Sequence, residues 1–328
     1  MTKIVQRPLG KSGPKVAAIG LGCMSLSGVY GAADDAQSVA LIQHAIDSGI
    51  NHLDSSDMYG WGHNEQVLAK AIKGRRDKVM LATKFGQVQR EGQGNGVNGR
   101  PEYIRAACEA SLKRLGVDVI DLYYQHRVDP DVGVEDTVGA MAGLVAAGKV
   151  RHLGLCEAHP DRIWRAHAVH PIAAVQTEYS ILYRDEAEET RATTKALGIA
   201  FVAYSPLGRG FLTGTLKDLS DIDGRRSQHP RFQAEHFAAN RKLVAGIEAI
   251  AAEKGCTPSQ LTLAWLLAQG DDVVAIPGTR YVPRLEENAG AMAVSLTSAE
   301  VARISAAVPK GAASGTRYPA GGMKGVYL

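Results

Sequence analysis

The segment Val79-Met80-Leu81-Ala82-Thr83 decides the fold of this chain, because a short apolar run ends abruptly in a charged residue, Lys84. The apolar run before it, Ile50 to Leu53, ends in Asp54, and Tyr59 follows. Short apolar runs of this kind are typical of buried strands. A charge at the end of a buried strand is rarely stable without a partner. We therefore expect the two strand ends to converge on one site.

Strand-like and helix-like segments alternate along most of the chain, after a predicted amino-terminal hairpin. This alternation indicates βαβ units and a parallel sheet. Eight such strands predict a single α/β domain over residues 1–328, a (β/α)8 TIM barrel. The predicted strands are 19–21, 50–54, 79–84, 117–124, 150–156, 173–176, 199–204 and 273–276, and the helices are 36–48, 65–72, 102–115, 134–147, 161–168, 187–197, 242–254 and 258–268.

Three segments do not fit the alternation. Residues 205–240 are polar, Gly-rich and Arg-rich, and predict a long functional loop after the seventh strand. Residues 309–328 form a Gly- and Ala-rich tail, for which we predict another lid-like segment; the alternative is a disordered end. Residues 92–99 are rich in glycine, but they do not join a strand directly to a helix as a dinucleotide fingerprint does. We interpret them as a flexible loop.

Composition sets limits on function. The 328 residues are 45% hydrophobic and 22% charged, as in soluble globular proteins, and the net charge of +3 gives no reason to expect nucleic acid as a partner. No apolar run reaches the ~18 residues of a membrane helix, and no secretory signal is visible, so a cytoplasmic location is expected. The four cysteines are scattered, and neither a disulfide framework nor a metal site is predicted.

The residues at three strand ends suit proton transfer. A phenol has a pKa of ~10, so Tyr59 can act as an acid near neutrality only if its phenolate is stabilised. Lys84 would supply that stabilisation, and Asp54 would keep the amine charged. The run over residues 117–124 leads to His126, whose imidazole could orient a substrate oxygen. The set favours delivery of a proton to a carbonyl oxygen while a hydride reaches the carbon.

Asp54-x4-Tyr59, Lys84 and His126, in these contexts, resemble the tetrad of the aldo-keto reductases. The resemblance covers nearly the whole chain and is most like the bacterial and plant branch with pyridoxal-reductase-like and auxin-induced-like members. Supporting segments are Gly20-Leu21-Gly22-Cys23-Met24, Leu53-Asp54-Ser55-Ser56-Asp57-Met58-Tyr59-Gly60, Val175-Gln176-Thr177-Glu178-Tyr179, Tyr204-Ser205-Pro206-Leu207-Gly208-Arg209-Gly210, Ile276-Pro277-Gly278-Thr279 and Arg317-Tyr318-Pro319.

The resemblance implies a role for each matching residue. Tyr59 would be the proton donor, with Lys84 and Asp54 as the partners that lower its pKa. His126 would orient the carbonyl. Independently of the resemblance, Trp61 is a candidate wall of the substrate pocket because it directly follows Tyr59-Gly60, with core packing as the alternative.

The resemblance also implies a nicotinamide cofactor. Gln176 would hold its carboxamide, Tyr204 would stack on its ring, and backbone amides of residues 205–210 would meet its phosphates. Arginine suits a 2'-phosphate, so NADPH is expected over NADH. The implied cofactor residues are Gly22, Cys23, Met24, Asp54, Cys156, Glu157, Gln176, Tyr204, Ser205, Pro206, Leu207, Gly208, Gly210, Ile276, Gly278, Thr279, Arg280, Arg284, Glu287 and Asn288.

Two positions depart from the family pattern. Cys156-Glu157 stands where many relatives carry Ser-Asn, and we expect Glu157 to accept from the carboxamide nitrogen instead. Gly278 stands where many relatives carry lysine, so either Arg280 replaces that charge or the cofactor preference is relaxed.

Two other functions stay open at this point. Lys84 could form a Schiff base in an aldolase, although Asp54 would hold its amine charged. The barrel could also be a catalytically weak NADPH-sensing subunit, since some relatives serve channels. A small carbonyl or alcohol is the expected partner, and neither its identity nor the formation of a homo-oligomer follows from the sequence.

Overall fold

The computed structural model describes residues 3–11, 13–90, 94–222 and 224–328. Its main sheet has eight strands, and all neighbouring pairs in it are parallel. The order in the sheet follows the order in the chain: β3 (Leu21–Gly22), β4 (His52–Asp54), β5 (Met80–Phe85), β8 (Ile120–Gln125), β9 (Val150–Cys156), β10 (Ile172–Glu178), β11 (Ala200–Tyr204) and β12 (Val273–Ala275).

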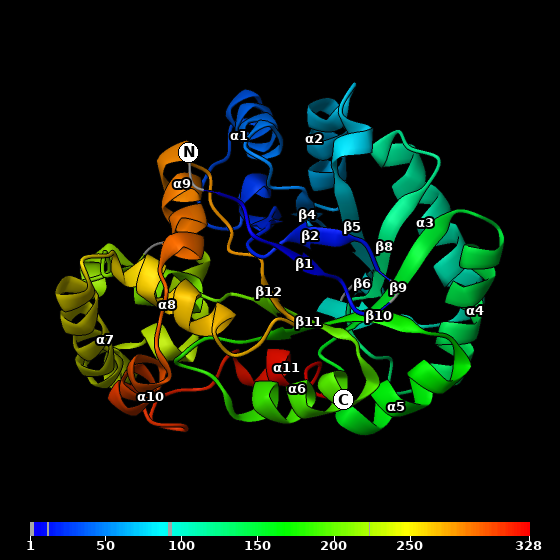
Figure 1. Ribbon diagram of the computed structural model, residues 1–328. Helices are drawn as coiled ribbons and strands as arrows, with labels where there is room; N and C mark the ends of the chain where they lie inside the picture. Colours follow the sequence, from blue (N-terminus) through cyan, green and yellow to red (C-terminus); the bar gives the residue numbers. More distant parts are fainter. Residues whose placement is uncertain (1–2, 12, 91–93, 223) are drawn as a thin grey trace.

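Backbone bridges close the sheet into a barrel. Ile19 pairs with Ala275, and Gly22 pairs with Gly278, so the first and last strands meet. Helices surround the strands, as Figure 1 shows, and the predicted (β/α)8 TIM barrel is confirmed. The helices are α1 (Asp35–Asp47), α2 (His63–Ile72), α3 (Pro101–Leu115), α4 (Val134–Ala146), α5 (Pro160–Val169), α6 (Asp185–Leu197), α7 (Ala234–Lys254), α8 (Pro258–Leu267), α9 (Val282–Gly290), α10 (Ser298–Ala307) and the short α11 (Ala320–Met323).

The amino-terminal hairpin covers one end of the barrel. Its strands are β1 (Gln6–Pro8) and β2 (Lys15–Ala17), and the backbone N–H of Lys11 donates to the carbonyl oxygen of Gly198, just before β11. The hairpin therefore lies at the amino ends of the strands (Figure 1). The active site of a barrel of this kind is expected at the opposite, carboxyl end.

Side chains along each strand point alternately into the barrel and toward the helices, and this alternation decides where the site residues point. Met80 and Ala82 of β5 pack inside the barrel, whereas Leu81 packs between the sheet and the helices. Successive side chains of a strand point to opposite faces, so Lys84 shares the inner face with Met80 and Ala82. The same alternation applies to Gln176 on β10 and Tyr204 on β11. The predicted strand ends thus share one interior rim.

The stretch after β11 is more regular than predicted. Helix α7 begins at Ala234, eight residues before the expected start at Lys242, and short 3-10 helices precede it: η3 (Gly208–Thr213), η4 (Leu219–Asp221), η5 (Gly224–Gln228) and η6 (Pro230–Phe232). The first turns of α7 are polar, but Phe237 is buried and its ring lies 5.2 Å from that of Phe211. This packing stabilises a helix where polarity had indicated a loop.

One other expectation needs correction. Within the predicted loop over residues 92–99, β7 (Gly94–Val97) is a strand that pairs with β6 (Gln87–Arg90), while residues 92 and 93 lie outside the described residues. The tail over residues 309–328 packs on the barrel, and the carboxyl terminus lies beside α5 and α6 (Figure 1). Helices α9 and α10 were not predicted. Within the described residues, no helix is both long and apolar enough to cross a membrane.

Candidate active site

An ion pair between Lys84 and Asp54 lies at the centre of the rim. The Lys84 ammonium donates to Asp54 Oδ1 and to the carbonyl oxygen of Ser55, at 2.7 Å for the latter. The second Asp54 oxygen accepts from Gln176 Nε2 at 2.8 Å. Burial alone would lower the pKa of Lys84, but the negative charge of Asp54 raises it above its ordinary value. The amine is therefore held as a buried cation.

Tyr59 lies beside this cation. The Lys84 nitrogen is 5.2 Å from the centre of the Tyr59 ring. Burial raises the pKa of Tyr59 to about 12, and Lys84 acts against that rise, as expected. Asp54 raises the pKa of Tyr59 directly, so the expectation that Asp54 lowers it was wrong. Its carboxylate assists the phenol only indirectly, because it keeps Lys84 charged.

The rings of His126 and Tyr59 form an edge-to-face contact. The two ring centres are 5.9 Å apart, at an interplanar angle of 84°. Burial, reinforced by the charges of Arg127 and Lys84, holds the pKa of His126 well below its ordinary value. Its Nδ1 lies 3.0 Å from Ser56 Oγ. The imidazole is therefore neutral and anchored on its Nδ1 side.

Backbone strain gathers at the same rim. Trp61, Glu157, Ser205 and Arg209 have positive φ angles of 52°, 57°, 47° and 56°. Such angles are costly for residues other than glycine, and they cluster at functional sites. Trp61 is also 46% exposed, next to the turn that carries Tyr59. This exposure fits its predicted place at the wall of a substrate pocket.

Glu157 binds the carboxyl-terminal tail. Arg317 donates to both carboxylate oxygens of Glu157, at 2.8 and 2.9 Å, and this pair is completely buried. The Tyr204 hydroxyl and the backbone N–H of Glu178 donate to the same carboxylate, at 2.8 and 3.0 Å. Charge pairing with Arg317 keeps the pKa of Glu157 low despite its burial. Three of these donors reach Oε1 and one reaches Oε2. The expected contact of Glu157 with a carboxamide nitrogen stays a prediction.

The contacts of Arg317 and Tyr318 define what we call the tail network: Glu157, Tyr204, Arg317 and Tyr318. The Tyr204 hydroxyl lies 3.0 Å from that of Tyr318, and Arg317 also reaches Glu186 on α6 at 2.5 Å. Tyr204 is the residue expected to stack on a nicotinamide ring. The tail network therefore connects that ring position to residues more than a hundred positions later in the chain.

The loop after β11 forms more hydrogen bonds within itself than predicted. The N–H groups of Gly208 and Gly210 donate to the carbonyl oxygens of Ser205 and Leu207, at 2.9 and 3.0 Å. These two amides are not free for phosphate oxygens, contrary to expectation. Arg226 lies nearby, because a Cβ added to Gly210 would lie 3.5 Å from its guanidinium.

Residues expected at the adenosine end lie on the β12–α9 connection and on α9. Arg280 donates to the carbonyl oxygen of Ala32, which lies in the connection between β3 and α1. Arg284 pairs with Glu287 at 2.7 Å on the exposed side of α9. Asn288 is buried, and Thr279 Oγ1 accepts from the backbone N–H of Tyr281 at 3.1 Å. That Arg280 replaces the lysine missing at Gly278 stays a prediction.

The rim brings together most of the remaining predicted cofactor residues. Cys23 N–H donates to the carbonyl oxygen of Asp54, and Arg127 donates to the Cys156 sulfur. Among the predicted cofactor residues besides Asp54, those that are buried are Cys23, Cys156, Glu157, Gln176, Pro206, Gly208, Ile276, Thr279 and Asn288; those at least partly exposed are Gly22, Met24, Tyr204, Ser205, Leu207, Gly210, Gly278, Arg280, Arg284 and Glu287.

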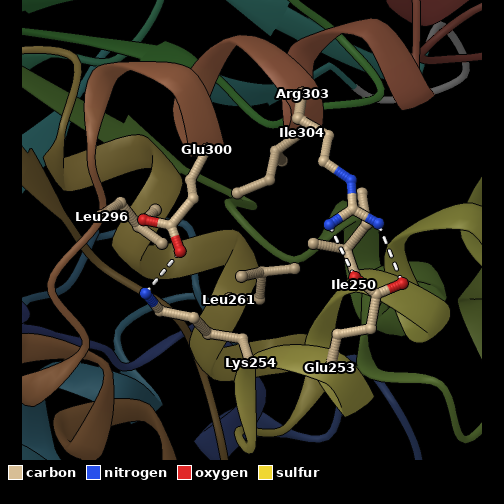
Figure 2. A pocket seen from close by; sticks show the side chains of 8 residues that line it. All are labelled: Ile250, Glu253, Lys254, Leu261, Leu296, Glu300, Arg303 and Ile304. Atoms are coloured by element: carbon tan, nitrogen blue, oxygen red, sulfur yellow. Dashed lines mark hydrogen bonds and ion pairs between the residues drawn. The ribbon is translucent and has the colours of Figure 1, made fainter.

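Two cavities lie elsewhere, between outer helices. Figure 2 shows one of about 130 Å³, where α7 and α10 are joined by the ion pairs Lys254–Glu300 and Arg303–Glu253. The other, of about 330 Å³, lies between α3 and α4. Each charged side chain drawn in Figure 2 already has a partner of opposite charge. Neither cavity competes with the rim as a site for chemistry.

Sequence reasoning missed several residues of the site. Ser56 stands two positions after Asp54 and contacts His126, and Arg127 directly follows His126. Their positions beside predicted catalytic residues were a usable signal. Arg231 and Arg209 both bind the buried Glu178, and no local pattern pointed to that cluster.

The closed parallel barrel brings an acid, an amine, a phenol and an imidazole together at its carboxyl end, where barrel enzymes carry their active sites. Comparison with known proteins agrees: the profile of the Aldo/keto reductase family matches residues 18–309. The chain belongs to the aldo/keto reductase family, and it is an oxidoreductase of the TIM-barrel type.

Individual relatives extend this match over nearly the whole chain. A "Probable aldo-keto reductase 1" from Glycine max is 46% identical over 313 residues, which is 94% of this chain and 90% of that protein. The structure of a glycerol dehydrogenase from Gluconobacter oxydans matches with a TM-score of 0.82 at 27% identity, covering 93% of this chain and 94% of the other. An aldo/keto reductase from Klebsiella pneumoniae in complex with NADP and acetate matches with a TM-score of 0.74 at 27% identity, covering 95% and 98%. The branch within the family stays a prediction.

Proposed function

We propose that this protein reduces an aldehyde or ketone to an alcohol with NADPH, and that Tyr59 supplies the proton. The observation that carries the proposal is the fully buried Lys84–Asp54 ion pair beside the Tyr59 ring. A buried cation next to a phenol stabilises the phenolate that forms when the phenol gives up its proton.

The residues of the rim divide the work in this proposal. Tyr59 donates its proton to the carbonyl oxygen, and Lys84 stabilises the resulting phenolate. His126 donates a hydrogen bond to the same oxygen and so orients the carbonyl. Trp61 shields the pocket from one side. NADPH, when bound, supplies the hydride.

The chemistry of the surrounding residues fits a cofactor that carries phosphates. Two glycines lie next to arginine side chains. A Cβ added to Gly31 would lie 3.5 Å from the guanidinium of Arg280, and a Cβ added to Gly210 would lie 3.5 Å from that of Arg226. Glycine leaves room for a ligand to approach each guanidinium, and guanidinium groups bind phosphate well. The NADP in the Klebsiella pneumoniae relative supports the same choice of cofactor.

Arg280 should discriminate between the two nicotinamide cofactors. We expect Arg280→Ala to raise the Kd for NADPH about tenfold, the loss of roughly one charge-assisted hydrogen bond, and to change the Kd for NADH little. Fluorescence titration of both cofactors measures the two constants. Arg303→Ala, which removes an exposed arginine paired with Glu253 of α7, is the matched control. An equal loss for both cofactors would show that Arg280 does not recognise the 2'-phosphate.

The proposal as a whole is tested by the absorbance of NADPH in the presence of aldehydes, quinones, pyridoxal and keto-sugars. Consumption of NADPH with at least one carbonyl, much faster than without it, is the expected result. Oxidation at one slow rate, whichever carbonyl is offered, would instead favour the sensing subunit. Borohydride trapping of a substrate on Lys84 would favour the aldolase, which Asp54 opposes by keeping the amine protonated.

A further inference from the structure

A chain of hydrogen bonds connects His126 to an acid that the proposed reaction does not use. Ser56 is fully buried in the turn between β4 and α2. Its Oγ lies 3.0 Å from His126 Nδ1 and 3.3 Å from Asp57 Oδ1. The backbone N–H of Met58 donates to the same Oγ at 3.3 Å. Ser56 therefore stands between the imidazole and the carboxyl group.

Two complete arrangements of protons satisfy this chain. A hydroxyl donates one hydrogen bond and accepts two, and Met58 takes one of the acceptor positions. If Asp57 is protonated, it donates to Ser56, and Ser56 donates to His126 Nδ1. If Asp57 is ionised, Ser56 donates to the carboxylate, and His126 Nδ1–H donates to Ser56. The Lys84 carbonyl oxygen is a weaker competitor for the Ser56 proton, at 3.5 Å, and already accepts from the Asp57 N–H at 3.1 Å.

The two arrangements place the imidazole proton on different nitrogens. Because His126 is neutral, a single ring nitrogen carries a proton. With Asp57 protonated, that nitrogen is Nε2, which can donate to a substrate carbonyl. With Asp57 ionised, Nδ1 carries the proton, and Nε2 presents a lone pair that repels a carbonyl oxygen.

We propose that Ser56 and Asp57 are positioning residues that set the tautomer of His126, so that carbonyl reduction depends on the protonation state of Asp57. The proposal rests on the proposed function, because it assigns His126 Nε2 to the carbonyl oxygen. The exchange is balanced: the Ser56 proton moves to Nδ1, the Asp57 proton moves to Ser56, and the Nε2 proton leaves for solvent. One proton is released, and no other group is changed.

The surroundings of Asp57 raise its pKa, so that the proton exchange with Ser56 and His126 occurs near neutral pH. Burial, helped by Glu65 of α2, raises the pKa of Asp57 to about 7, although Arg114 of α3 and the Ser56 hydrogen bond lower it. Tyr103 of α3 and Tyr123 of β8 are the other titratable groups close enough to interact with it, and burial raises the pKa of both. Glu65 is itself held by Thr83 and Arg114, at 2.7 and 2.6 Å. Asp57 is thus protonated below about pH 7, where the carbonyl-binding tautomer is present.

The pH profile of a single turnover tests the proposal. For one titrating group with a pKa of about 7, the rate of NADPH oxidation by a good carbonyl substrate should fall about tenfold between about pH 6 and about pH 8. Ser56→Ala and Asp57→Asn should both abolish this step, since one breaks the chain and the other cannot ionise. Ser55→Ala is the matched control: Ser55 is equally buried, but its hydroxyl donates to Asn64, and the step should persist.

The tautomer itself can be observed without any turnover. In protein labelled with nitrogen-15 histidine, with His126 assigned through His126→Asn, the protonated nitrogen should change from Nε2 to Nδ1 as the pH rises through about 7. The same change should be absent from Asp57→Asn. A tautomer that stays constant with pH in the wild type, or a rate step that survives in both variants, overturns the proposal. If no carbonyl is reduced at all but the tautomer still switches, the proposed function fails while the switch stands.

Discussion

We expect Tyr59→Phe to lower the rate of carbonyl reduction by about 10²- to 10⁴-fold, the usual contribution of a general acid, and to leave the Kd for NADPH within about twofold. The substitution removes a hydroxyl and keeps the ring beside Lys84, so cofactor contacts are preserved. Lys84 and Asp54 remain paired, and the fold is not expected to change. Stopped-flow turnover and fluorescence titration of NADPH, on the same preparation, measure both quantities.

Tyr179→Phe is the control for this result. Tyr179 is fully buried, and its hydroxyl has no hydrogen-bond partner in the described part of the chain, so its loss removes a phenol without touching the rim. Its turnover should match that of the wild type. Turnover by Tyr59→Phe within about threefold of the wild type would rule out Tyr59 as the acid.

Arg317→Ala should cost about 3–5 kcal/mol of folding stability, because it leaves the Glu157 carboxylate buried and without its cation. Glu186 loses a partner as well, and Tyr204 shares hydrogen bonds with the same carboxylate. Urea unfolding followed by circular dichroism measures the loss. Arg303→Ala is the matched control, since Arg303 makes a two-bond pair with Glu253 on the surface (Figure 2) and its loss should cost only about 0–1 kcal/mol.

The loss should depend on pH in a defined direction. In the wild type, Arg317 keeps the folded-state pKa of Glu157 low, so the pair stabilises the fold above the unfolded pKa, and this stability is lost as the pH falls through the folded pKa. Without Arg317, burial raises the pKa of Glu157. As the pH falls, Glu157 becomes protonated, and the variant no longer carries the cost of a buried, unpaired carboxylate. The difference between variant and wild type should therefore shrink in acid. Adding Glu157→Gln to the Arg317→Ala variant should restore part of the stability at neutral pH. Equal losses for Arg317→Ala and Arg303→Ala would contradict a special role for the buried pair.

The catalytic rim was readable from the sequence because each member ends a recognisable strand. Lys84 ends an apolar run in which alternate residues face the barrel interior, and Asp54 and His126 follow similar runs. Parallel strands in a barrel bring their carboxyl ends to one rim, so local patterns were enough to predict the convergence. The expected direction of Asp54's own effect on Tyr59 was wrong because a carboxylate raises the pKa of a neighbouring phenol; its help reaches Tyr59 only through Lys84.

The tail network could not be predicted in this way. Arg317 and Glu157 are 160 positions apart, and an arginine in a Gly-rich tail gives no sign that it will be buried. Polar composition likewise hid the first turns of α7, whose position depends on Phe237 packing against Phe211. The hydrogen bond between Ser56 and His126 spans 70 positions in the chain. It can form because β4, which precedes Ser56, and β8, which precedes His126, both pair with β5.

The sequence by itself determined the barrel and the identity of the groups at its rim, because hydrophobic periodicity and strand ends are local properties. Only the tertiary structure decided how those groups are used: Lys84 as a cation held by Asp54, Glu157 as the anchor of the tail, and Ser56 as the connection between His126 and Asp57. The physical reason is that protonation states and hydrogen-bond partners depend on burial and on distances of a few ångströms between residues far apart in the chain.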